Sequence, residues 1–327
     1  MDTLIKRIRE QQGLSISKSS KMSQMSYAQW ERIETGDVSP TLKSLHKIAK
    51  TLSVPVKALL PDTHQRETWI FFALKGGVGK TTLSLICAKI LSDMGYDVVY
   101  LDNDFSQASA TLWFINQIQD RDEGQKIYEQ LLEHNIFSLM TGKSTLAQSL
   151  LSFSKTPIRL IGSVAEEEDP KKKFQGEPGS DRIQMIRLEP LKCDYLIVDT
   201  PGEFTDISNW SLALADKAII PVDLEMFSLG TLSLVFSKIQ KAQQFLNPNL
   251  NSIFILPNKM KSQRDNCHFA LETLKKNYEE FMVLDDKGHP VTVNDHADIS
   301  NFSAGTGTLY PSSKNYQLLS NFIQRLI

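Results

Sequence analysis

The sequence predicts an α/β protein in which a mostly parallel sheet carries helices on both faces, preceded by a small all-α domain. Two observations lead to this fold class. From residue 69 onward, short apolar runs alternate with longer amphipathic segments, which is typical of parallel strands joined by helices. Before residue 62, apolar residues recur only at helical spacing. We therefore expect an all-α domain over residues 1–61, a polar linker over 62–68 and an α/β domain over 69–327.

The composition is that of a globular protein. The 327 residues are 41% hydrophobic and 23% charged, which excludes disordered and collagen-like chains. The three cysteines form no CxxC pair, which argues against a disulfide framework and against a zinc or iron–sulfur site. No apolar stretch is long enough for a signal-peptide core or a membrane span. We expect a cytoplasmic protein without stable membrane association.

Charge is unevenly distributed along the chain. The net charge is -2, which argues against a uniformly basic protein that binds nucleic acid by bulk charge. Residues 1–66, however, contain 11 Lys and Arg against 6 Asp and Glu, a balance of +5, and the remainder has a balance of -7. A basic module joined to an acidic body suggests that the first domain binds nucleic acid.

The first sixty residues predict about five short helices. Their apolar bursts are separated by residues that start or stop helices. Ser15, Ser26 and Thr41 stand at helix N-cap positions, and Gly13 and Gly36 stand where helices end. The stretch contains no strand-like run, so an all-α module is expected.

The rest of the chain predicts alternating strands and helices. Six strands are expected, at residues 69–74, 98–101, 158–162, 195–198, 218–222 and 253–256. Helices are expected among others at residues 81–94, 125–134, 229–245 and 267–280. Residues 166–179 are charged and contain Pro and Gly, which favours a solvated surface loop.

The most informative stretch follows the first of these strands and opens the first of these helices. Its sequence over residues 74–82 is Leu-Lys-Gly-Gly-Val-Gly-Lys-Thr-Thr. Glycines let backbone N–H groups approach phosphate oxygens without a side chain in the way. Lys80 can then reach the terminal phosphates of a nucleotide, and the Thr81 hydroxyl can take one position around Mg²⁺. The candidate nucleotide-binding residues of this loop are Lys75, Gly76, Gly77, Val78, Gly79, Lys80, Thr81 and Thr82.

The loop misses the ordinary Walker A motif, because Leu74 stands where that motif has Gly. Residues 75–82 instead resemble the deviant motif KGGxGK[ST]T of the ParA/MinD family of partition and positioning ATPases, with Lys75 as the extra lysine. Two acidic motifs support the resemblance: residues 98–104 end in Asp-Asn-Asp, and residues 195–202 end in Asp-Thr-Pro-Gly. Pro-Asn-Lys at residues 257–259 is similar to the family's adenine-contacting turn. The resemblance implies a P-loop NTPase fold over residues 69–327 and hydrolysis of ATP to ADP and phosphate, with Mg²⁺.

Charge and the resemblance together suggest a role for each side chain. A phosphoryl group in transfer spreads negative charge over its oxygens, so catalysis is mostly positioning and electrostatic stabilisation. We expect Lys80 and the loop amides to supply the stabilisation, and Asp199 to hold Mg²⁺ through water. The resemblance implies that Lys75 reaches the partner's nucleotide in a sandwich homodimer and that Asp104 orients the attacking water. The catalytic candidates are therefore Lys75, Lys80 and Asp104, the metal candidates are Thr81, Asp102 and Asp199, and the adenine candidates are Pro257 and Asn258.

Residues 24–36, followed by Ser-Pro-Thr-Leu at 39–42, resemble the recognition-helix region of Cro-type (XRE) helix-turn-helix domains. Ser26 would cap the helix, Trp30 and Ile33 would face the core, and Gln24 replaces the usual turn Gly. Gln can read adenine and Arg can read guanine in the major groove. The DNA-contact candidates are Ser26, Tyr27, Ala28, Gln29 and Arg32. A small helical adaptor that binds protein is the alternative.

The two resemblances predict an ATP-dependent DNA partition protein associated with the nucleoid. It would segregate a plasmid, phage or chromosome with a ParB-like centromere-binding partner and repress its own operon by binding operator DNA. Homodimerisation on ATP binding would pair two helix-turn-helix modules on half-sites about one helical turn apart. Two alternatives stay open: a MinD-like membrane-associated positioning ATPase, and a transcription regulator that uses the ATPase only as a dimerisation switch.

Two weaker patterns concern surfaces. Seven basic residues could form a non-specific DNA surface or simply a solvated face: Lys238, Lys241, Lys259, Lys261, Arg264, Lys275 and Lys276. Apolar residues recur at helical spacing over 318–327, with Arg325 as the only basic residue among the last thirteen. Because membrane-targeting helices are rich in Lys and Arg, we expect a helix packed on the sheet.

Overall fold

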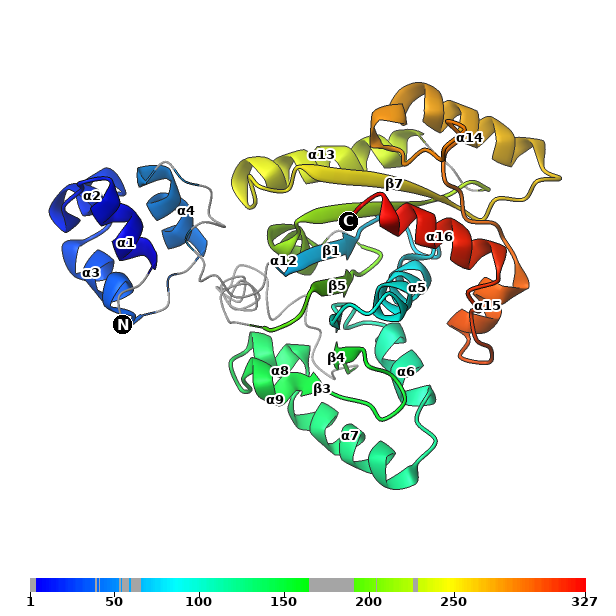
Figure 1. The fold of residues 1–327 in the computed structure, drawn as a ribbon, viewed down its shortest axis with the longest axis horizontal. Coiled ribbons are helices and arrows are strands. Elements are labelled where there is room, and N and C mark those ends of the chain that lie inside the picture. The colour runs from blue at the N-terminus through cyan, green and yellow to red at the C-terminus, as the bar shows by residue number, and fades with distance from the viewer. Residues whose placement is uncertain are drawn as a thin grey trace. The chain divides into compact units, whose positions relative to one another are not determined.

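The computed structural model describes residues 4–38, 40, 42–52, 54, 59, 66–164, 191–203, 205–225 and 229–327. The chain divides into two compact units. The first contains the N-terminal helices, and the second contains the sheet with its covering helices (Figure 1). The surface loop predicted at residues 166–179 lies outside the described residues.

Four short helices make up the described part of the first unit: α1 (Leu4–Gln11), α2 (Ile16–Met22), α3 (Tyr27–Thr35) and α4 (Leu42–Thr51). They surround a buried apolar cluster that includes Trp30, Ile33, Leu45 and Ile48. The predicted helix cap at Thr41 and most of the predicted fifth helix fall outside the described residues.

Caps and turns of the first unit agree with the sequence prediction. Ser15 and Ser26 both accept a hydrogen bond from the backbone N–H three residues further on. Gly36 ends α3 with a φ of 81°. Gln24 has a φ of 54° in the turn between α2 and α3, a conformation that glycine adopts without strain and other residues rarely adopt.

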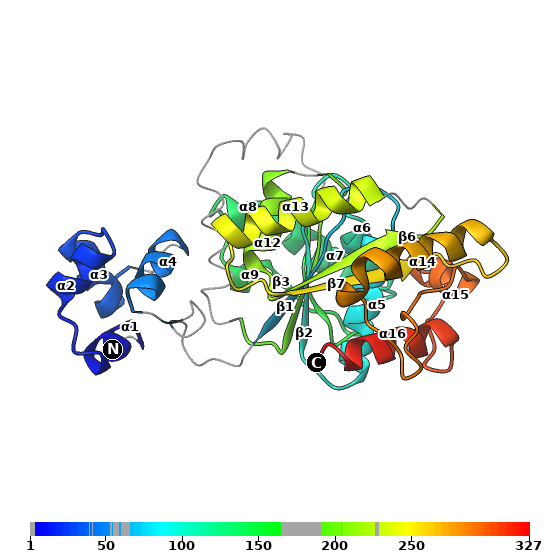
Figure 2. The same ribbon diagram turned by 90° about the horizontal axis from the view of Figure 1, so that it is seen from above.

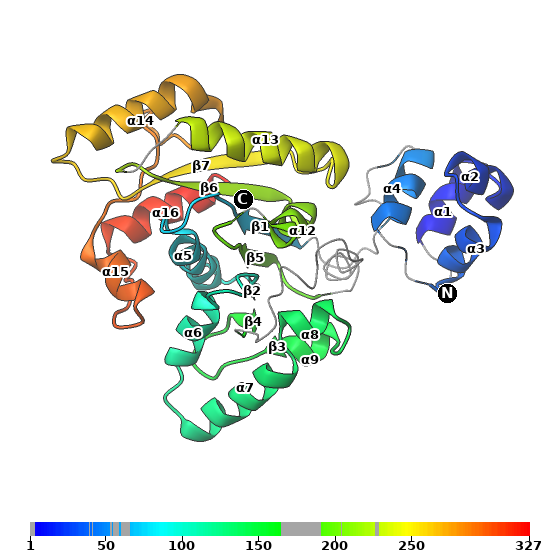
Figure 3. The same cartoon turned by 180° about the vertical axis from the view of Figure 1, so that it is seen from behind.

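The second unit is built on a seven-stranded sheet in the order β3-β4-β2-β5-β1-β6-β7 (Figure 2, Figure 3). Neighbouring strands pair in parallel, except that β3 is antiparallel to β4. The strands are β1 (Glu67–Phe71), β2 (Val98–Asp102), β3 (Leu150–Leu151), β4 (Arg159–Ile161), β5 (Tyr195–Asp199), β6 (Lys217–Asp223) and β7 (Ser252–Asn258). The predicted mostly parallel α/β fold is confirmed.

Most predicted elements agree with the structure to within about two residues at each end, and the differences with a clear physical cause concern β3, β1 and α7. β3 was not expected, because two apolar residues carry no recognisable period and only their pairing with β4 makes them a strand. β1 begins at Glu67, inside the segment predicted as linker, because Glu67 pairs with Tyr195 at the start of β5. α7 begins at Arg121 rather than at residue 125, because the Asp120 side chain caps it by accepting from the Glu123 N–H.

Helices cover both faces of the sheet. In Figure 2, α5 and α16 lie on one side of the sheet, and α12 and α13 lie on the other. The helices of this unit are α5 (Lys80–Asp93), α6 (Ser109–Asn116), α7 (Arg121–Glu133), α8 (Ile136–Met140), α9 (Leu146–Ser149), α12 (Asp206–Leu214), α13 (Leu229–Phe245), α14 (Asp265–Tyr278), η2 (Glu279–Phe281), α15 (Ala297–Ser303) and α16 (Lys314–Gln324).

The C-terminal helix is part of the core. Leu319, Phe322 and Ile323 of α16 are fully buried and join the apolar cluster that contains α5 and one face of the sheet. The prediction of a packed C-terminal helix is therefore confirmed. Among the described residues, no helix combines the length and apolar character needed to span a membrane.

Strand register brings the motif residues to one edge of the sheet. Asp102 and Phe71 are both aligned with Asp199, and Asp223 is aligned with Asn258. Because these residues end parallel strands, the loops that follow all leave the sheet at the same edge. This is the edge at which open α/β sheets bind ligands.

Candidate nucleotide site

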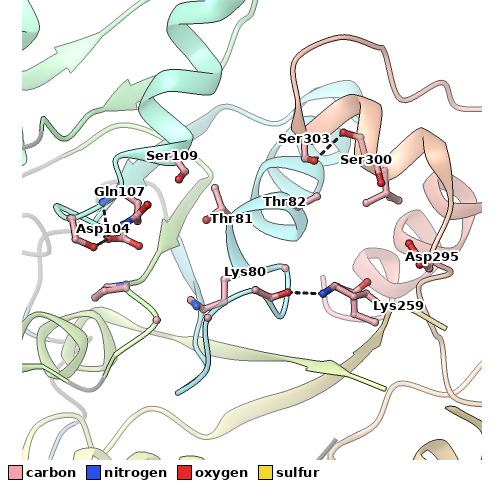
Figure 4. Close-up of a pocket in the computed structure, with 18 of the residues that line it drawn as sticks. Lys80, Thr81, Thr82, Asp104, Gln107, Ser109, Lys259, Asp295, Ser300 and Ser303 are labelled. Atoms are coloured by element: carbon pink, nitrogen blue, oxygen red, sulfur yellow. Dashed lines mark hydrogen bonds between the residues drawn. The ribbon is translucent and has the colours of Figure 1, made fainter. Parts of the chain in front are cut away.

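The phosphate-loop candidate connects β1 to the N-terminus of α5. Gly77 and Gly79 have backbone φ angles of 75° and 96°, which residues other than glycine rarely adopt. Gly79 is the N-cap residue of α5 and, among the described residues, no side-chain hydrogen bond caps this helix, so its first backbone N–H groups are left for a ligand. A helix N-terminus of this kind favours a phosphate group. Figure 4 shows Lys80, Thr81 and Thr82 along this segment.

A cleft of about 620 Å³ lies at this edge of the sheet. Its walls come from segments that are far apart in the sequence (Figure 4). The lining residues are Gly76, Gly77, Gly79, Lys80, Thr81, Thr82, Asp104, Ser106, Gln107, Ser109, Pro201, Gly202, Glu203, Asn258, Lys259, Asn294, Asp295, Ile299, Ser300 and Ser303. Six of the eight predicted loop residues line the cleft, together with Asp104 and Asn258.

Asp199 and Thr81 form the candidate metal position. The Thr81 hydroxyl donates to Asp199 Oδ2 at 2.5 Å, while Asp199 Oδ1 is buried and has no hydrogen-bond partner among the described residues. Burial raises the pKa of the Asp199 carboxyl, and the charge of Asp102 adds to this rise. An added cation would remove that electrostatic penalty and satisfy the unpartnered oxygen.

The donor set fits Mg²⁺. Hard oxygen ligands suit this ion, which keeps several waters and shares its coordination with substrate phosphates. Among the described residues, no group of three or more His, Cys, Asp or Glu side chains could hold a metal alone. One carboxylate and one hydroxyl beside a phosphate loop are therefore the protein contribution that a Mg²⁺–nucleotide complex requires.

Asp102, like Asp199, does not line the cleft, but its carboxylate has different partners. Its Oδ2 accepts from the Thr111 N–H at 2.8 Å and from the Thr111 hydroxyl at 2.7 Å, and its Oδ1 accepts from the Asp104 N–H at 3.2 Å. Burial raises the pKa of this carboxyl, and the bonds from Thr111 act against the rise. Asp102 therefore fastens the chain after β2 to α6, and its carboxylate is already occupied by protein donors.

Asp104 does lie at the cleft wall. Its Oδ1 accepts from the Ser106 N–H at 3.1 Å, from the Ser106 hydroxyl at 2.7 Å and from the Gln107 N–H at 3.3 Å. These bonds hold the carboxylate at the start of a tight turn. The other oxygen, Oδ2, could accept a hydrogen bond from a water molecule or another donor in the cleft.

Lys80 is buried close to the side chains of Asp199 and Asp104. Its Nζ donates to the Lys75 carbonyl at 3.3 Å. Burial lowers the pKa of the Lys80 ammonium, and the charges of Asp199 and Asp104 oppose this effect. Gly202 approaches the same point, since a Cβ added to it would lie 3.5 Å from Lys80 Nζ. Lys75 itself lines a separate small hollow of about 40 Å³ rather than the cleft.

The predicted adenine turn is bonded to the phosphate loop. Asn258 Nδ2 donates to the Val78 carbonyl at 2.9 Å, and Lys259 Nζ donates to the Gly77 carbonyl at 2.7 Å. Lys259 also pairs with Asp223 at 2.8 Å. These bonds fix two carbonyls of the phosphate loop. Pro257 does not line the cleft.

Sequence reasoning missed one wall of the cleft. Asn294, Asp295 and residues from α15 line it, although this segment carried no recognised motif. An isolated parallel bridge between Met260 and Asn294 brings the segment beside the end of β7. This wall could not be predicted from a sequence pattern. The bridge joins single residues that are far apart in the chain, and one pair of residues has no periodicity that could be recognised.

In the helical unit, α3 separates core and surface residues as predicted. Trp30 and Ile33 are buried, whereas Tyr27, Gln29 and Arg32 are exposed. Ala28 is exposed on the same helix, and Ser26 is its N-cap. The predicted contact set thus lies on the solvent side of α3, where a major groove could receive it.

A buried ion pair supports the position of α3. Arg9 donates to Glu34 through Nε at 2.7 Å and through Nη2 at 2.9 Å. The Trp30 indole N–H donates to the same carboxylate at 2.6 Å. All three side chains are buried, so the charges are paired where water cannot solvate them.

Several of the basic residues that could have formed a non-specific DNA surface are paired with acidic groups. Lys259 pairs with Asp223, Lys261 with Glu225 and Asp295, Arg264 with Glu225, and Lys275 with Glu279. These pairs reduce the positive charge that this surface offers to DNA phosphates.

Comparison with known families identifies both units. A family model described as an AAA domain matches residues 67–252, which is more than half of the chain. The chain belongs to this family, in its ParA/MinD type. A helix-turn-helix model matches residues 5–59. The ParA-type domain thus begins at β1, and a helix-turn-helix domain precedes it.

Relatives of this ParA-type protein include a cell division protein and a sporulation initiation inhibitor protein. The cell division protein PomZ of Myxococcus xanthus is 28% identical over 224 residues, which is 67% of this chain and 65% of PomZ. The sporulation initiation inhibitor protein Soj of Bacillus subtilis is 25% identical over 63% of this chain and 78% of Soj. The chain therefore spans slightly less than two thirds of the PomZ length.

Solved structures confirm the fold. A plasmid partition protein of Borrelia burgdorferi bound to AMPPNP superposes with a TM-score of 0.63 at 20% identity, covering 80% of this chain and 98% of that chain. Cobyrinic acid a,c-diamide synthase of Mycobacterium smegmatis, with bound ADP and magnesium, has a TM-score of 0.62 at 19% identity, covering 80% and 94%. The fold thus occurs in proteins of more than one function.

Proposed function

We propose that the protein is an ATP-dependent DNA partition protein that binds and hydrolyses ATP at the cleft. The observation that carries the proposal is the convergence of Lys80, Thr81 and Asp104 on one cleft at the carboxyl edge of a ParA-type sheet, with the buried Asp199 bonded to Thr81 behind the cleft wall. Lys80 and the amides of the glycine loop hold the phosphates, and Asp104 orients the attacking water. When bound, Mg²⁺ neutralises phosphate charge; Thr81 and Asp199 would hold it, the latter through water.

Two copies would hydrolyse ATP as a nucleotide-sandwich homodimer. Lys75 stabilises the partner's phosphates in this arrangement, which explains why its side chain is not needed to line the chain's own cleft. A ParB-like centromere-binding protein would stimulate hydrolysis. The alignments with PomZ and Soj, together with the helix-turn-helix match, support a ParA-type positioning role rather than a metabolic one.

The helix-turn-helix domain would bind operator DNA and repress the protein's own operon. Gln29 and Arg32 are exposed on α3 and carry the bidentate groups that read adenine and guanine. A transcription regulator with the ATPase as a dimerisation switch is the second candidate, and the paired basic residues around α14 favour it by weakening non-specific DNA binding.

A plasmid-loss assay in cells carrying Lys80→Ala tests partition. We expect the replicon that encodes the protein to be lost faster, while its copy number per cell stays unchanged. Normal inheritance with deregulated transcription of the operon would instead establish the second candidate.

A footprint on DNA around the protein's own gene, with ATP, ADP or no nucleotide, tests operator binding. One protected inverted repeat is expected, and ATP-only coating without a protected repeat would contradict autorepression. Binding to anionic liposomes that depends on ATP would overturn the partition proposal in favour of a MinD-like role, against which the buried apolar face of α16 argues.

A further inference from the structure

A buried polar pair lies just behind the cleft and has no part in the roles assigned so far. Asn103 stands between Asp102 and Asp104 and is fully buried. Its Nδ2 donates to Ser211 Oγ on α12 at 2.8 Å and, over a longer distance of 3.4 Å, to the Ile207 carbonyl of the same helix; Ser211 is also fully buried. Asn103 Oδ1 has no hydrogen-bond partner among the described residues.

This pair is not explained by stability. A buried amide whose oxygen lacks a partner destabilises a fold relative to an apolar side chain of similar volume. Asp102 and Asp199 beside it are also buried and polar, whereas Leu101 and Val198, one position further back along the strands, are apolar. A polar side chain at residue 103 therefore calls for a reason other than packing.

The pair joins the two loops that flank the phosphate position. On one side, the Asn103 N–H donates to the Asp199 carbonyl at 3.1 Å, and the next residue is Asp104 at the cleft wall. On the other side, α12 follows the loop at residues 201–203, which also lines the cleft.

The second loop is held from both ends. The Thr200 hydroxyl donates to the Phe71 carbonyl at 2.6 Å, and the Ser208 hydroxyl donates to the Glu203 carbonyl at 2.7 Å. Between them Gly202 lies against the phosphate loop, since a Cβ there would be 3.4 Å from Gly76 Cα. A shift of α12 would therefore move this loop relative to Asp104.

We propose that the Asn103–Ser211 hydrogen bond is a positioning device that keeps Asp104 in register with the loop at residues 201–203 on the opposite side of the terminal phosphate. This inference rests on the proposed ATPase function. Asn103 is fully buried and does not line the cleft, so it acts through the placement of Asp104. A hydrogen bond is directional, whereas an apolar contact lets the two packed segments slide past each other. A displacement of about 1 Å at a reacting group can lower the rate about a hundredfold.

Asn103→Leu, Ser211→Ala and the double variant test this proposal. Each single change removes one partner of the Asn103–Ser211 bond, and the double change removes both. We expect kcat for ATP hydrolysis to fall about tenfold in each single variant, within the range set by small misplacements. The ATP dissociation constant should change less than about twofold, because the residues that hold the nucleotide are unchanged.

The double variant separates positioning from simple packing. We expect its melting temperature to recover toward that of the wild type while kcat remains low, and no lower than in the single variants, because the two residues act as one unit. Recovery of kcat together with the melting temperature would overturn the proposal. Ser149→Ala, which removes a fully buried hydroxyl from α9, is the matched control and should keep kcat.

The outcomes also distinguish this inference from the proposed function. A wild-type chain that hydrolyses no ATP would overturn both. Active wild type with unchanged kcat in Ser211→Ala and in the double variant would overturn the positioning role alone. If Asn103→Leu does not fold, Ser211→Ala still decides, because it deletes the shorter of the two bonds from Asn103 to α12 with a smaller change in volume.

Discussion

Asp102 and Asp199 end two paired strands, yet their carboxylates have different partners. Thr111 and the Asp104 N–H occupy the oxygens of Asp102, whereas one oxygen of Asp199 is buried without a partner among the described residues. An aspartate in a sequence motif is therefore not by itself evidence of a metal ligand. The number of protein donors already bonded to each carboxylate separates a structural acid from one that is open to a cation.

Asp104→Ala should separate nucleotide binding from hydrolysis. Removing the carboxylate leaves the phosphate loop, Thr81 and Asp199 in place, so ATP binding and dimerisation should persist. Loss of the group that orients water should lower kcat by about a hundredfold or more. Phosphate release and nucleotide titration measure the two quantities, and Asp122→Ala on the exposed start of α7 serves as control. Normal hydrolysis in Asp104→Ala would contradict the assignment.

Gly79→Ala should damage the phosphate loop. The residue has a φ of 96°, and an added Cβ would lie 2.5 Å from Asn258 Nδ2, which holds the Val78 carbonyl. We expect a loss of about 1–3 kcal/mol of unfolding free energy and at least about tenfold weaker ATP binding. Thermal melting and nucleotide titration provide the measurements. Gly76→Ala meets no atom within 4 Å at its Cβ and should melt near the wild-type temperature.

At the level of elements, the position of α3 depends on a contact with α1. Arg9 on α1 binds Glu34 on α3, and Trp30 donates to the same carboxylate. The sequence predicted α3 from its cap, its apolar positions and its terminal glycine, all of which are local. The ion pair joins residues that no local pattern connects, so it was not predicted.

Glu34→Ala should destabilise the helical unit without changing the phosphate site. It would leave the Arg9 guanidinium buried without its carboxylate, at a cost of about 3–5 kcal/mol in unfolding free energy. Circular dichroism of the full chain should show an early melting step, while ATP binding stays intact. Glu31→Ala, on the exposed side of α3, should melt like the wild type. Equal melting of the two variants would contradict a stabilising role for the pair.

Helices and strands were predicted correctly where the apolar residues of a segment showed a recognisable periodicity or a continuous run. Strands such as β5 and β6 are buried on both faces and form continuous apolar runs, and α13 has the predicted bounds. It failed for β3, which depends on its partner strand, and at the start of α7, where the Asp120 cap was overlooked. The physical difference is whether the signal lies in one segment or in a contact between two.

At the scale of the whole molecule, the proposed activity links two units through a dimer. A single helix-turn-helix module makes few base contacts, so paired half-sites are needed for tight binding. An ATP-dependent homodimer would raise the effective concentration of the second module once the first is bound. Nucleotide state would then control operator occupancy without any contact between the units of one chain.

Lys75→Ala tests this linkage. The variant should still bind ATP, because Lys80, Thr81 and Asp199 are unchanged, but it should lose ATP-dependent dimerisation and paired half-site protection. Sedimentation with ATP and footprinting of the operator measure the two effects. Lys241→Ala, on the exposed side of α13, is the control. Paired protection by a variant that stays monomeric would show that the units are not coupled in this way.

The amino-acid sequence alone was sufficient for the fold class, the family and most of the phosphate loop, because glycines, caps and apolar periods act within short segments. The three-dimensional structure was needed to distinguish Asp102 from Asp199, to add the wall formed by Asn294 and α15, and to find the Asn103–Ser211 bond. Each of these depends on side chains from distant segments meeting at the carboxyl edge of the sheet. Strand order and register set those meetings, and neither is encoded in any single segment.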